Sequence, residues 1–272
     1  MTRIAVVGAG KLGEALLSGM VRAGRSPADL IVTTRRAERG EELAQRYGVT
    51  ALPNAEAARA AGILLVTVKP QDIDPLLVEI GPAASAETLV VSVVAGLPTA
   101  LFERRLADGT PVVRVMTNTP VLVDEALSAI SAGRHATEEH LSATEAIFAP
   151  VGKVLRVPES QQDAVTALSG SGPAYFFFLV EAMTDAGILL GLPRAVAAEL
   201  LVQTVLGAAV MLRDTGEHPV QLREAVTSPG GTTINAIREL ENHGVRAAFL
   251  SAIEAARDRA RDLGTSAGQL PA

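Results

Sequence analysis

Residues 4–13 read IAVVGAGKLG, and this stretch decides the fold of the chain. Its first four residues are continuously apolar, which is typical of a strand buried on both faces. The glycines that follow have the spacing G-x-G-x-x-G, and an apolar helical pattern continues from Leu12 to Met20. In this arrangement Gly8 allows a tight turn, Gly10 lets the backbone approach a pyrophosphate, and Gly13 lets the helix lie close to the strand. The stretch predicts a dinucleotide-binding unit.

The end of the second expected strand, residues 30–33, indicates which dinucleotide binds. NAD sites place an Asp or Glu about 20 residues past the glycines, where it binds the ribose hydroxyls. Here the strand runs into Thr34, Arg35 and Arg36, and two guanidinium groups suit a 2′-phosphate better than a bare ribose. We therefore expect NADP, with NADPH preferred and NADH possible. The alternative is a solvated arginine pair that opens a helix over residues 41–47.

The remainder of the chain divides into two parts with different patterns. Strand and helix patterns alternate up to Pro158, with further buried strands at 63–68, 89–94 and 112–115 and edge-like strands at 126–131 and 154–157. This alternation predicts an α/β, Rossmann-type, doubly wound and mostly parallel sheet. From Ser160 onward only helical patterns are found. We therefore predict a dinucleotide-binding (NADP) domain at 1–158 and an all-helical substrate-binding and dimerisation domain at 159–272.

Composition limits the partners of this chain. Its 272 residues are 48% hydrophobic, carry a net charge of −6 and include no cysteine. This balance argues against a nucleic-acid surface, and the lack of cysteine excludes disulfides, thiolate metal sites and a thiol nucleophile. We expect a cytoplasmic protein with no metal, no signal peptide and no membrane partner. The apolar helix at 195–211 suggests burial in a dimer, and the tail after Leu263 is expected to fray.

A second glycine-rich stretch, Val226–Thr233, lies between two helical patterns. Its Ser-Pro and Gly-Gly pairs indicate a turn, and Thr232 or Thr233 is expected to cap a helix that begins at about Ile234. Free backbone N–H groups at the start of that helix would suit a small carboxylate. The alternative is an ordinary loop between helices.

The lysines constrain the reaction. The chain has three, Lys11, Lys69 and Lys153, and all precede the helical part. Reduction of a ketone needs a proton delivered to the oxygen as the hydride arrives, and similarly built hydroxyacid dehydrogenases use a lysine of the second domain. A cyclic imine can bind already protonated, so the protein needs only to position its carbon and hold its carboxylate. An imino acid is therefore the expected substrate.

Residues 222–240, LREAVTSPGGTTINAIREL, are similar to the signature segment of pyrroline-5-carboxylate reductases. Three other segments agree with this resemblance: 68–70 (VKP), 114–120 (RVMTNTP) and 163–175 (DAVTALSGSGPAY). The resemblance implies reduction of 1-pyrroline-5-carboxylate to L-proline, the last step of proline biosynthesis. It also implies a homodimer with intertwined helical domains, in some members assembled into a ring of five dimers, a homodecamer.

The resemblance also assigns site residues. The positions it implies for the cofactor are Gly8, Ala9, Gly10, Lys11, Leu12, Thr34, Arg35, Arg36, Asn54, Val68, Lys69, Pro70, Ala95 and Asn118. Those for the substrate are Glu159, Gly230, Gly231, Thr232 and Thr233, with Thr233 as the catalytic contact. Asn54 has the alternative role of a plain N-cap, and Lys69 that of an exposed side chain.

Two departures and three rival interpretations accompany this assignment. Ala225 stands where many members have Asn or Gln, and Asp124 to Ala126 stand where the family usually has a glycine. The first puts a cofactor contact in doubt, and the second the path of the backbone. The rivals are a reductase for another cyclic imino acid, a non-catalytic NADP-binding sensor, and a scaffold dimer with a vestigial nucleotide site.

Overall fold

The computed structural model describes residues 2–268, which form two compact units. Unit 1 contains the described residues up to Ser171 and those from Ala256 onward. Unit 2 is Gly172–Ala255. Residues 159–171 and the end of the last helix thus pack with the N-terminal part of the chain. The domain division at residue 159 stays a prediction.

Unit 1 is built on an eight-stranded sheet in the order β3-β2-β1-β4-β5-β6-β7-β8 among the described residues. The strands are β1 (Ile4–Val7), β2 (Leu30–Thr33), β3 (Thr50–Ala51), β4 (Ile63–Val66), β5 (Leu89–Ser92), β6 (Val112–Met116), β7 (Ala126–Ala132) and β8 (Gly152–Arg156). All neighbouring strands pair in parallel except β6 and β7, which are antiparallel. The expected mostly parallel sheet is confirmed. The expectation that residues 126–131 form an edge strand is wrong, because β7 is paired on both sides.

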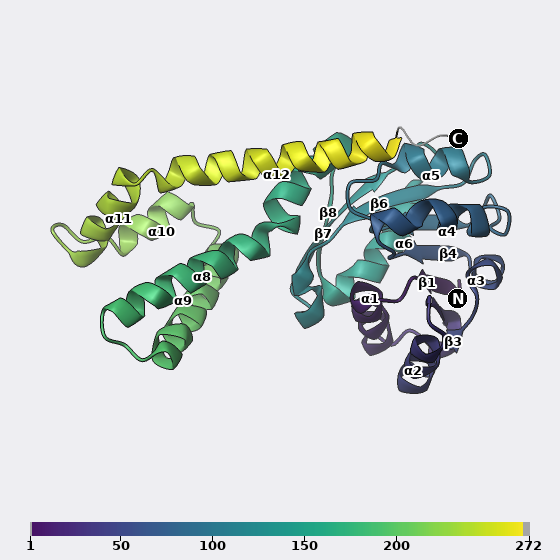
Figure 1. The fold of residues 1–272 in the computed structure, drawn as a ribbon, viewed down its shortest axis with the longest axis horizontal. Helices are drawn as coiled ribbons and strands as arrows, with labels where there is room; N and C mark the ends of the chain where they lie inside the picture. Colours follow the sequence, from purple (N-terminus) through teal and green to yellow (C-terminus); the bar gives the residue numbers. More distant parts are fainter. Residues whose placement is uncertain (1, 269–272) are drawn as a thin grey trace. The chain divides into compact units, whose positions relative to one another are not determined.

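Helices cover both faces of this sheet (Figure 1). They are α1 (Lys11–Arg22), α2 (Ala37–Tyr47), α3 (Asn54–Ala60), α4 (Ile73–Ile80), α5 (Thr99–Arg105), α6 (Glu138–Phe148) and α7 (Gln162–Val165). Alternate residues of β1 point to opposite faces: Val6 packs with Leu16 of α1, whereas Val7 packs in the cluster that contains Leu77 of α4. A strand buried on both sides needs apolar residues at every position, which is why β1 reads as a continuous apolar run.

Unit 2 is helical throughout. It contains α8 (Gly172–Leu189), α9 (Arg194–Thr215), α10 (Pro219–Ala225), α11 (Thr232–Asn242) and the first part of α12 (Val245–Gly268). No strand follows β8 in the described part of the chain, so the all-helical expectation is confirmed. Large apolar side chains on α8 and α9 are exposed, among them Phe177 at 69%, Leu189 at 88% and Leu200 at 55%. By length and composition α9 could also cross a membrane. An apolar surface of this extent indicates a partner.

Near its C-terminal end, α12 contacts the turn after β5. Ala260 is buried, and a Cβ added at Gly264 would lie 2.6 Å from the carbonyl oxygen of Gly96. Residues four apart lie on one face of a helix, so Ala260 and Gly264 present one small-residue surface to this turn. α12 extends past Leu263 to Gly268, and fraying of the tail stays a prediction. Residues 269–272 lie outside the described part of the chain.

Candidate cofactor and substrate sites

Two threonines hold the first glycine turn in place. The N–H of Gly8 donates to the carbonyl oxygen and to Oγ1 of Thr33 at 3.2 and 3.1 Å. The Thr67 hydroxyl lies within hydrogen-bond distance of the carbonyl oxygens of Val7 and Gly8, at 3.0 and 2.9 Å. Thr33 ends β2 and Thr67 follows β4, the two strands that flank β1. Thr67 is not among the predicted site residues, and its position at the end of a strand was the only sequence signal for it.

The glycines of this turn fit a dinucleotide. Gly8 has φ +82°, and a Cβ there would lie 2.4 Å from Cγ1 of Val68. A Cβ at Gly13 would lie 2.7 Å from Oγ1 of Thr67, so the helix can approach the strand only with glycine there. Gly10 is exposed, caps α1 without any side-chain hydrogen bond, and has no atom nearer than 3.9 Å to an added Cβ. The first N–H groups of α1 therefore face open space at the positive end of the helix, which suits a pyrophosphate.

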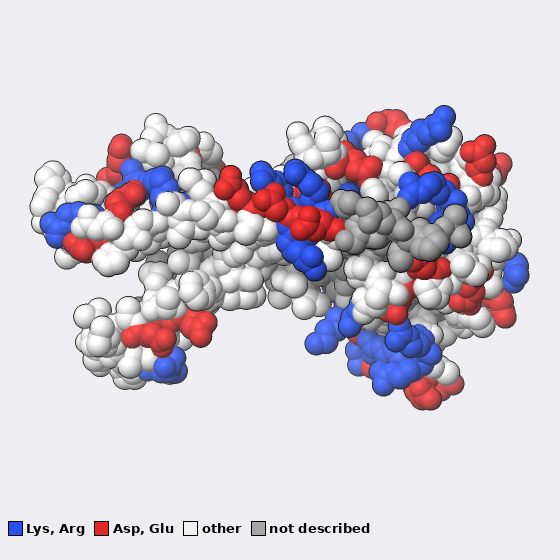
Figure 2. Space-filling model, turned by 45° about the horizontal axis from the view of Figure 1, so that its top comes forward, with Lys and Arg blue, Asp and Glu red and all other residues white. Residues whose placement is uncertain are grey.

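The predicted 2′-phosphate residues follow β2. The Thr34 hydroxyl donates to the carbonyl oxygen of Arg36 at 2.8 Å. Arg35 is 80% exposed and its Nη2 lies 2.6 Å from Oδ1 of Asp72. Arg36 is exposed and makes no ion pair with any described residue. The next helix begins at Ala37 rather than at residue 41. Lys and Arg side chains gather over the part of unit 1 that holds α1 and α2 (Figure 2).

Asn54 and Lys69 follow β3 and β4. Asn54 is the first residue of α3 and Pro53 is its N-cap, so the plain N-cap alternative for Asn54 is wrong. Its Nδ2 donates to Oε2 of Glu79 at 2.9 Å. Lys69 is exposed and precedes Pro70, the first residue of the 3-10 helix η2 (Pro70–Asp72). The exposed alternative for Lys69 therefore describes the structure, and a contact with a cofactor stays a prediction.

Ala95 and Asn118 follow β5 and β6. Ala95 is exposed in a turn. The side chain of Asn118 joins two segments: Oδ1 accepts from the N–H of Leu127 at 3.1 Å, and Nδ2 lies 3.3 Å from both oxygens of Ser169. Because β1 to β6 are parallel, all the predicted cofactor residues lie at the carboxyl ends of these strands. Ligands of doubly wound sheets bind outside the carboxyl ends of the strands, so this end of the sheet is the candidate cofactor site.

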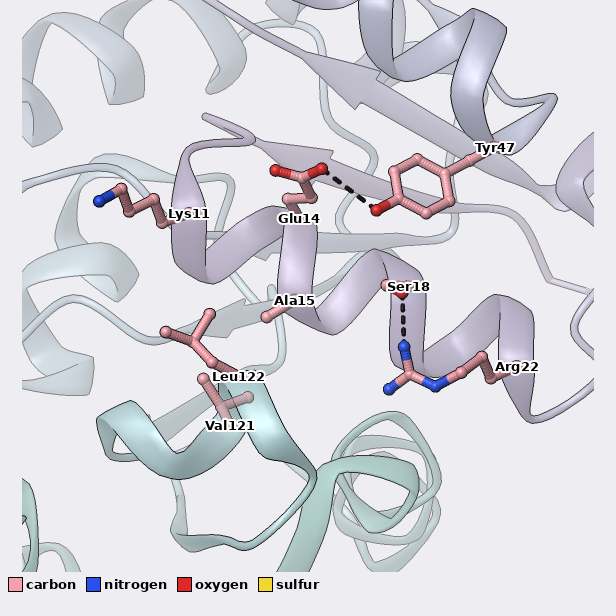
Figure 3. Close-up of a pocket in the computed structure, with 8 residues that line it drawn as sticks. All are labelled: Lys11, Glu14, Ala15, Ser18, Arg22, Tyr47, Val121 and Leu122. Carbon is pink, nitrogen blue, oxygen red and sulfur yellow. Dashed lines mark hydrogen bonds between the residues drawn. The ribbon is translucent and has the colours of Figure 1, made fainter.

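A small cavity of about 200 Å³ lies between α1 and the 3-10 helix η3 (Thr119–Val123) (Figure 3). Glu14 on its wall accepts hydrogen bonds from Arg39, from Arg46 at 2.8 Å and from Tyr47 at 3.1 Å. Burial raises the pKa of Glu14, but the hydrogen bonds from Arg39 and Tyr47 outweigh this effect and hold the pKa below its ordinary value. The cavity is smaller than most small-molecule pockets, which usually exceed about 300 Å³, and Lys11, one of the predicted cofactor residues, lies on its wall.

Asp124 ends η3 with φ 62° and is the single non-glycine residue with positive φ in the described part of the chain. Its carboxylate pairs with Arg22 of α1. Asp tolerates the left-handed conformation better than most residues, so the backbone here turns as a glycine would. A different backbone path from that of the family at this departure stays a prediction.

The second glycine stretch forms an open helix start in unit 2. Gly230 has φ +71°, and Gly231 is the N-cap of α11, without a side-chain hydrogen bond to the helix amides. The expectation that Thr232 or Thr233 caps the helix is wrong: α11 begins at Thr232. The turn closes earlier because the N–H of Gly231 donates to the carbonyl oxygen of Ser228 at 3.1 Å. The first N–H groups of α11 are free for an anion.

Glu159 has a structural role in unit 1. Its Oε1 accepts from the N–H of Thr99 at 2.7 Å, and its Oε2 accepts from the Thr99 hydroxyl at 2.7 Å. Its Oε1 also lies 3.5 Å from Nη1 of the buried Arg114, which has Asp163 as a second carboxylate neighbour at 3.5 Å. Glu159 therefore anchors the start of α5 and neutralises a buried arginine. The predicted substrate loop is in unit 2, and sequence reasoning missed Thr99 and Arg114.

Comparison with known proteins defines the class first. Residues 3–96 match the family "NADP oxidoreductase coenzyme F420-dependent", and residues 159–263 match "Pyrroline-5-carboxylate reductase dimerisation". Together with the Rossmann-type sheet these matches define an NADP-linked oxidoreductase with a helical dimerisation region. The exposed apolar side chains of α8 and α9 lie in that region, which accounts for them as parts of a subunit interface.

Full-length relatives identify the family. The chain is 47% identical over 268 residues to the pyrroline-5-carboxylate reductase of Corynebacterium melassecola, covering 97% of this chain and 99% of that one. It is 46% identical to the enzyme of that name from Mycobacterium tuberculosis, covering 97% of each chain. The structure of the Coxiella burnetii enzyme matches with a TM-score of 0.91 and 35% identity over 96% of this chain and 98% of that one. The chain belongs to the pyrroline-5-carboxylate reductase family.

A further relative bears on the cofactor. The Plasmodium falciparum pyrroline carboxylate reductase was solved with NADP bound, and it matches with a TM-score of 0.86 and 27% identity over 97% of this chain and 98% of that one. This match agrees with the open glycine turn and the arginines after β2. The expected NADP cofactor is confirmed.

Proposed function

We propose that this protein reduces 1-pyrroline-5-carboxylate to L-proline with a hydride from NADPH, the last step of proline biosynthesis. The observation that carries the proposal is identity of 40–47% over nearly the whole chain to enzymes with that name. The helices that follow the two glycine turns, α1 and α11, both begin without a side-chain cap. The fold thus contains one anion site for the cofactor and one for the substrate carboxylate, as such a reaction needs.

At the nucleotide end, the free N–H groups of α1 after Gly10 hold the pyrophosphate, and Arg35 and Arg36 hold the 2′-phosphate. NADPH supplies the hydride when it is bound. Thr33 and Thr67 keep the glycine turn in its open form through their hydrogen bonds to it. The roles of Lys69, Ala95 and Asn118 as cofactor contacts rest on their position at the carboxyl ends of the same parallel strands.

At the substrate end, the free N–H groups of Thr232 and Thr233 hold the carboxylate, with the positive end of α11 behind them. The N–H of Gly231 is already bonded to Ser228, so Gly231 shapes the turn rather than donating to the substrate. The Thr233 hydroxyl contacts the ring nitrogen or the carboxylate. The imine nitrogen enters protonated, the hydride adds to the ring carbon of the C=N bond, and the nitrogen keeps its proton in L-proline. The chain therefore needs no general acid for this step, which fits the absence of lysine after Lys153.

The assembly we propose is a homodimer formed through α8 and α9, and the family resemblance extends this proposal to a ring of five dimers. On this proposal α9 lies in the subunit interface and not in a membrane, and the enzyme works in the cytoplasm. Light scattering of the purified chain measures the assembly directly. Fractionation of cells that express the chain tests its location.

The test of function is an NADPH-oxidation assay with 1-pyrroline-5-carboxylate and, in parallel, its six-membered homologue. We expect oxidation that depends on the five-membered imine. Faster turnover of the six-membered ring would move the assignment to another cyclic imino acid, and no oxidation with either would favour a sensor or a scaffold.

A variant tests the substrate end of the proposal. Thr233→Ala is expected to keep NADPH binding and to lower kcat/KM for the imine about ten-fold or more, as loss of a hydrogen bond to a charged group does. Thr215→Ala is the matched control, since Thr215 bonds only within and just after α9. Unchanged kcat/KM in Thr233→Ala would remove this residue from the site.

A further inference from the structure

An ion pair joins the two segments on either side of the glycine turn. Arg35 follows β2, and Asp72 lies in η2 shortly after β4. Both strands pair with β1, one on each side. The 2.6 Å contact between Nη2 of Arg35 and Oδ1 of Asp72 therefore spans the carboxyl end of β1, which is part of the candidate cofactor site.

The two partners differ in freedom. Asp72 is the last residue of η2, its N–H donates to the carbonyl oxygen of Lys69 at 2.9 Å, and its side chain is 32% exposed. The Arg35 side chain is long and 80% exposed. Asp72 is thus held by its backbone and is the less exposed partner, whereas the side chain of Arg35 can turn to another anion without disturbing the fold.

We propose that Asp72 competes with the 2′-phosphate of NADP for Arg35 and so sets how strongly the enzyme prefers NADPH over NADH. This inference rests on the proposed function, because it takes Arg35 as a 2′-phosphate contact. Binding of a 2′-phosphate requires Arg35 to leave Asp72 and places a second negative charge near that carboxylate. NADH has no such group, so its binding leaves the ion pair intact. Asp72 thereby weakens the binding of NADPH and leaves the binding of NADH unchanged.

The magnitude follows from the exposure of the pair. Exposed ion pairs are weak because solvent screens them. Removal of the competing charge should therefore tighten binding of a 2′-phosphate by roughly two- to five-fold. Arg36, which makes no ion pair with any described residue, keeps a basal affinity for the phosphate when Arg35 is removed.

The experiment is a double-mutant cycle on the full-length enzyme with Asp72→Asn, Arg35→Ala and the two combined. Calorimetry measures binding of adenosine 2′,5′-bisphosphate and of 5′-AMP, which lacks the 2′-phosphate, without any substrate. NADPH and NADH are titrated alongside by fluorescence. Glu138→Gln is the control: it removes the same charge from an exposed carboxylate that pairs with Arg156 of β8, at the far edge of the sheet.

We expect Asp72→Asn to tighten binding of the bisphosphate and of NADPH two- to five-fold and to leave binding of 5′-AMP and NADH unchanged. The gain should occur only while Arg35 is present. Weaker bisphosphate binding would show that Asp72 positions Arg35 for the phosphate, and unchanged binding would show that Asp72 has no effect on Arg35. Either result would overturn the proposal. The same gain in the Arg35→Ala background or in Glu138→Gln would reveal a general charge effect and overturn it equally. Failure of the proposed function would appear separately, as absent imine turnover in an enzyme whose binding cycle can still be measured.

Discussion

Replacing Glu159 with alanine separates a structural anchor from a substrate contact. The change removes two hydrogen bonds of 2.7 Å to Thr99 at the start of α5 and leaves the buried Arg114 with Asp163 alone. Loss of the anchor at a helix start costs about 1 kcal/mol. A buried charge without any partner costs about 3–5 kcal/mol. Because Asp163 remains and Glu159 is 29% exposed, we take about 2 kcal/mol for this part and about 3 kcal/mol in total.

The assay is thermal unfolding at one fixed protein concentration, because association stabilises oligomers. A loss of about 3 kcal/mol lowers Tm by roughly 6–12 °C in a chain of this size. Ser160→Ala, at the exposed neighbouring position, is the control and should leave Tm unchanged. Steady-state kinetics well below Tm complete the test. If Tm stays constant while kcat/KM for the imine collapses, Glu159 acts on the substrate and the structural reasoning is refuted.

Three further predictions follow from the geometry. A Cβ at Gly231 would lie 2.4 Å from Oγ of Ser228, so Gly231→Ala should raise KM for the imine about ten-fold while NADPH titration stays unchanged; equal KM values would contradict the carboxylate site. Glu14→Gln should lower the unfolding free energy above pH 4.5, the ordinary pKa of this carboxyl. In denaturant titrations the difference from wild type should vanish as the pH falls through the lower pKa of the folded state. A difference that stays constant with pH would argue against the ion cluster around Glu14. Gly264→Leu would force α12 away from Gly96, and calorimetry should show a loss of about 1–3 kcal/mol; an unchanged Tm would mean that this contact is not tight.

The sequence predicted the elements that repeat a strong local pattern. Strands such as β1 and β4 are buried on both faces, so every position is apolar and the run is visible in one dimension. The G-x-G-x-x-G spacing predicted the turn because each glycine has a separate steric reason, and the contacts of Gly8 and Gly13 with Val68 and Thr67 supply those reasons.

The features that were missed depend on contacts between distant residues. The network of Thr99, Arg114 and Glu159 joins segments 60 residues apart, and no local pattern announces it. The place of β7 inside the sheet depends on a partner strand, β8, that follows it. The contact of α12 with Gly96 also joins segments that are far apart in the sequence. The start of α11 was misplaced by two residues because a glycine, not a threonine, caps it.

The most direct test of the account is a crystal structure of the enzyme with NADP and L-proline bound together. We predict that the proline carboxylate lies on the N–H groups of Thr232 and Thr233. We also predict that Cδ, the ring carbon next to nitrogen that does not carry the carboxylate, lies about 3–3.5 Å from the hydride-carrying carbon of the nicotinamide. A structure in which the glycine turn of α1 and the start of α11 are remote from each other in every pairing of subunits would contradict it.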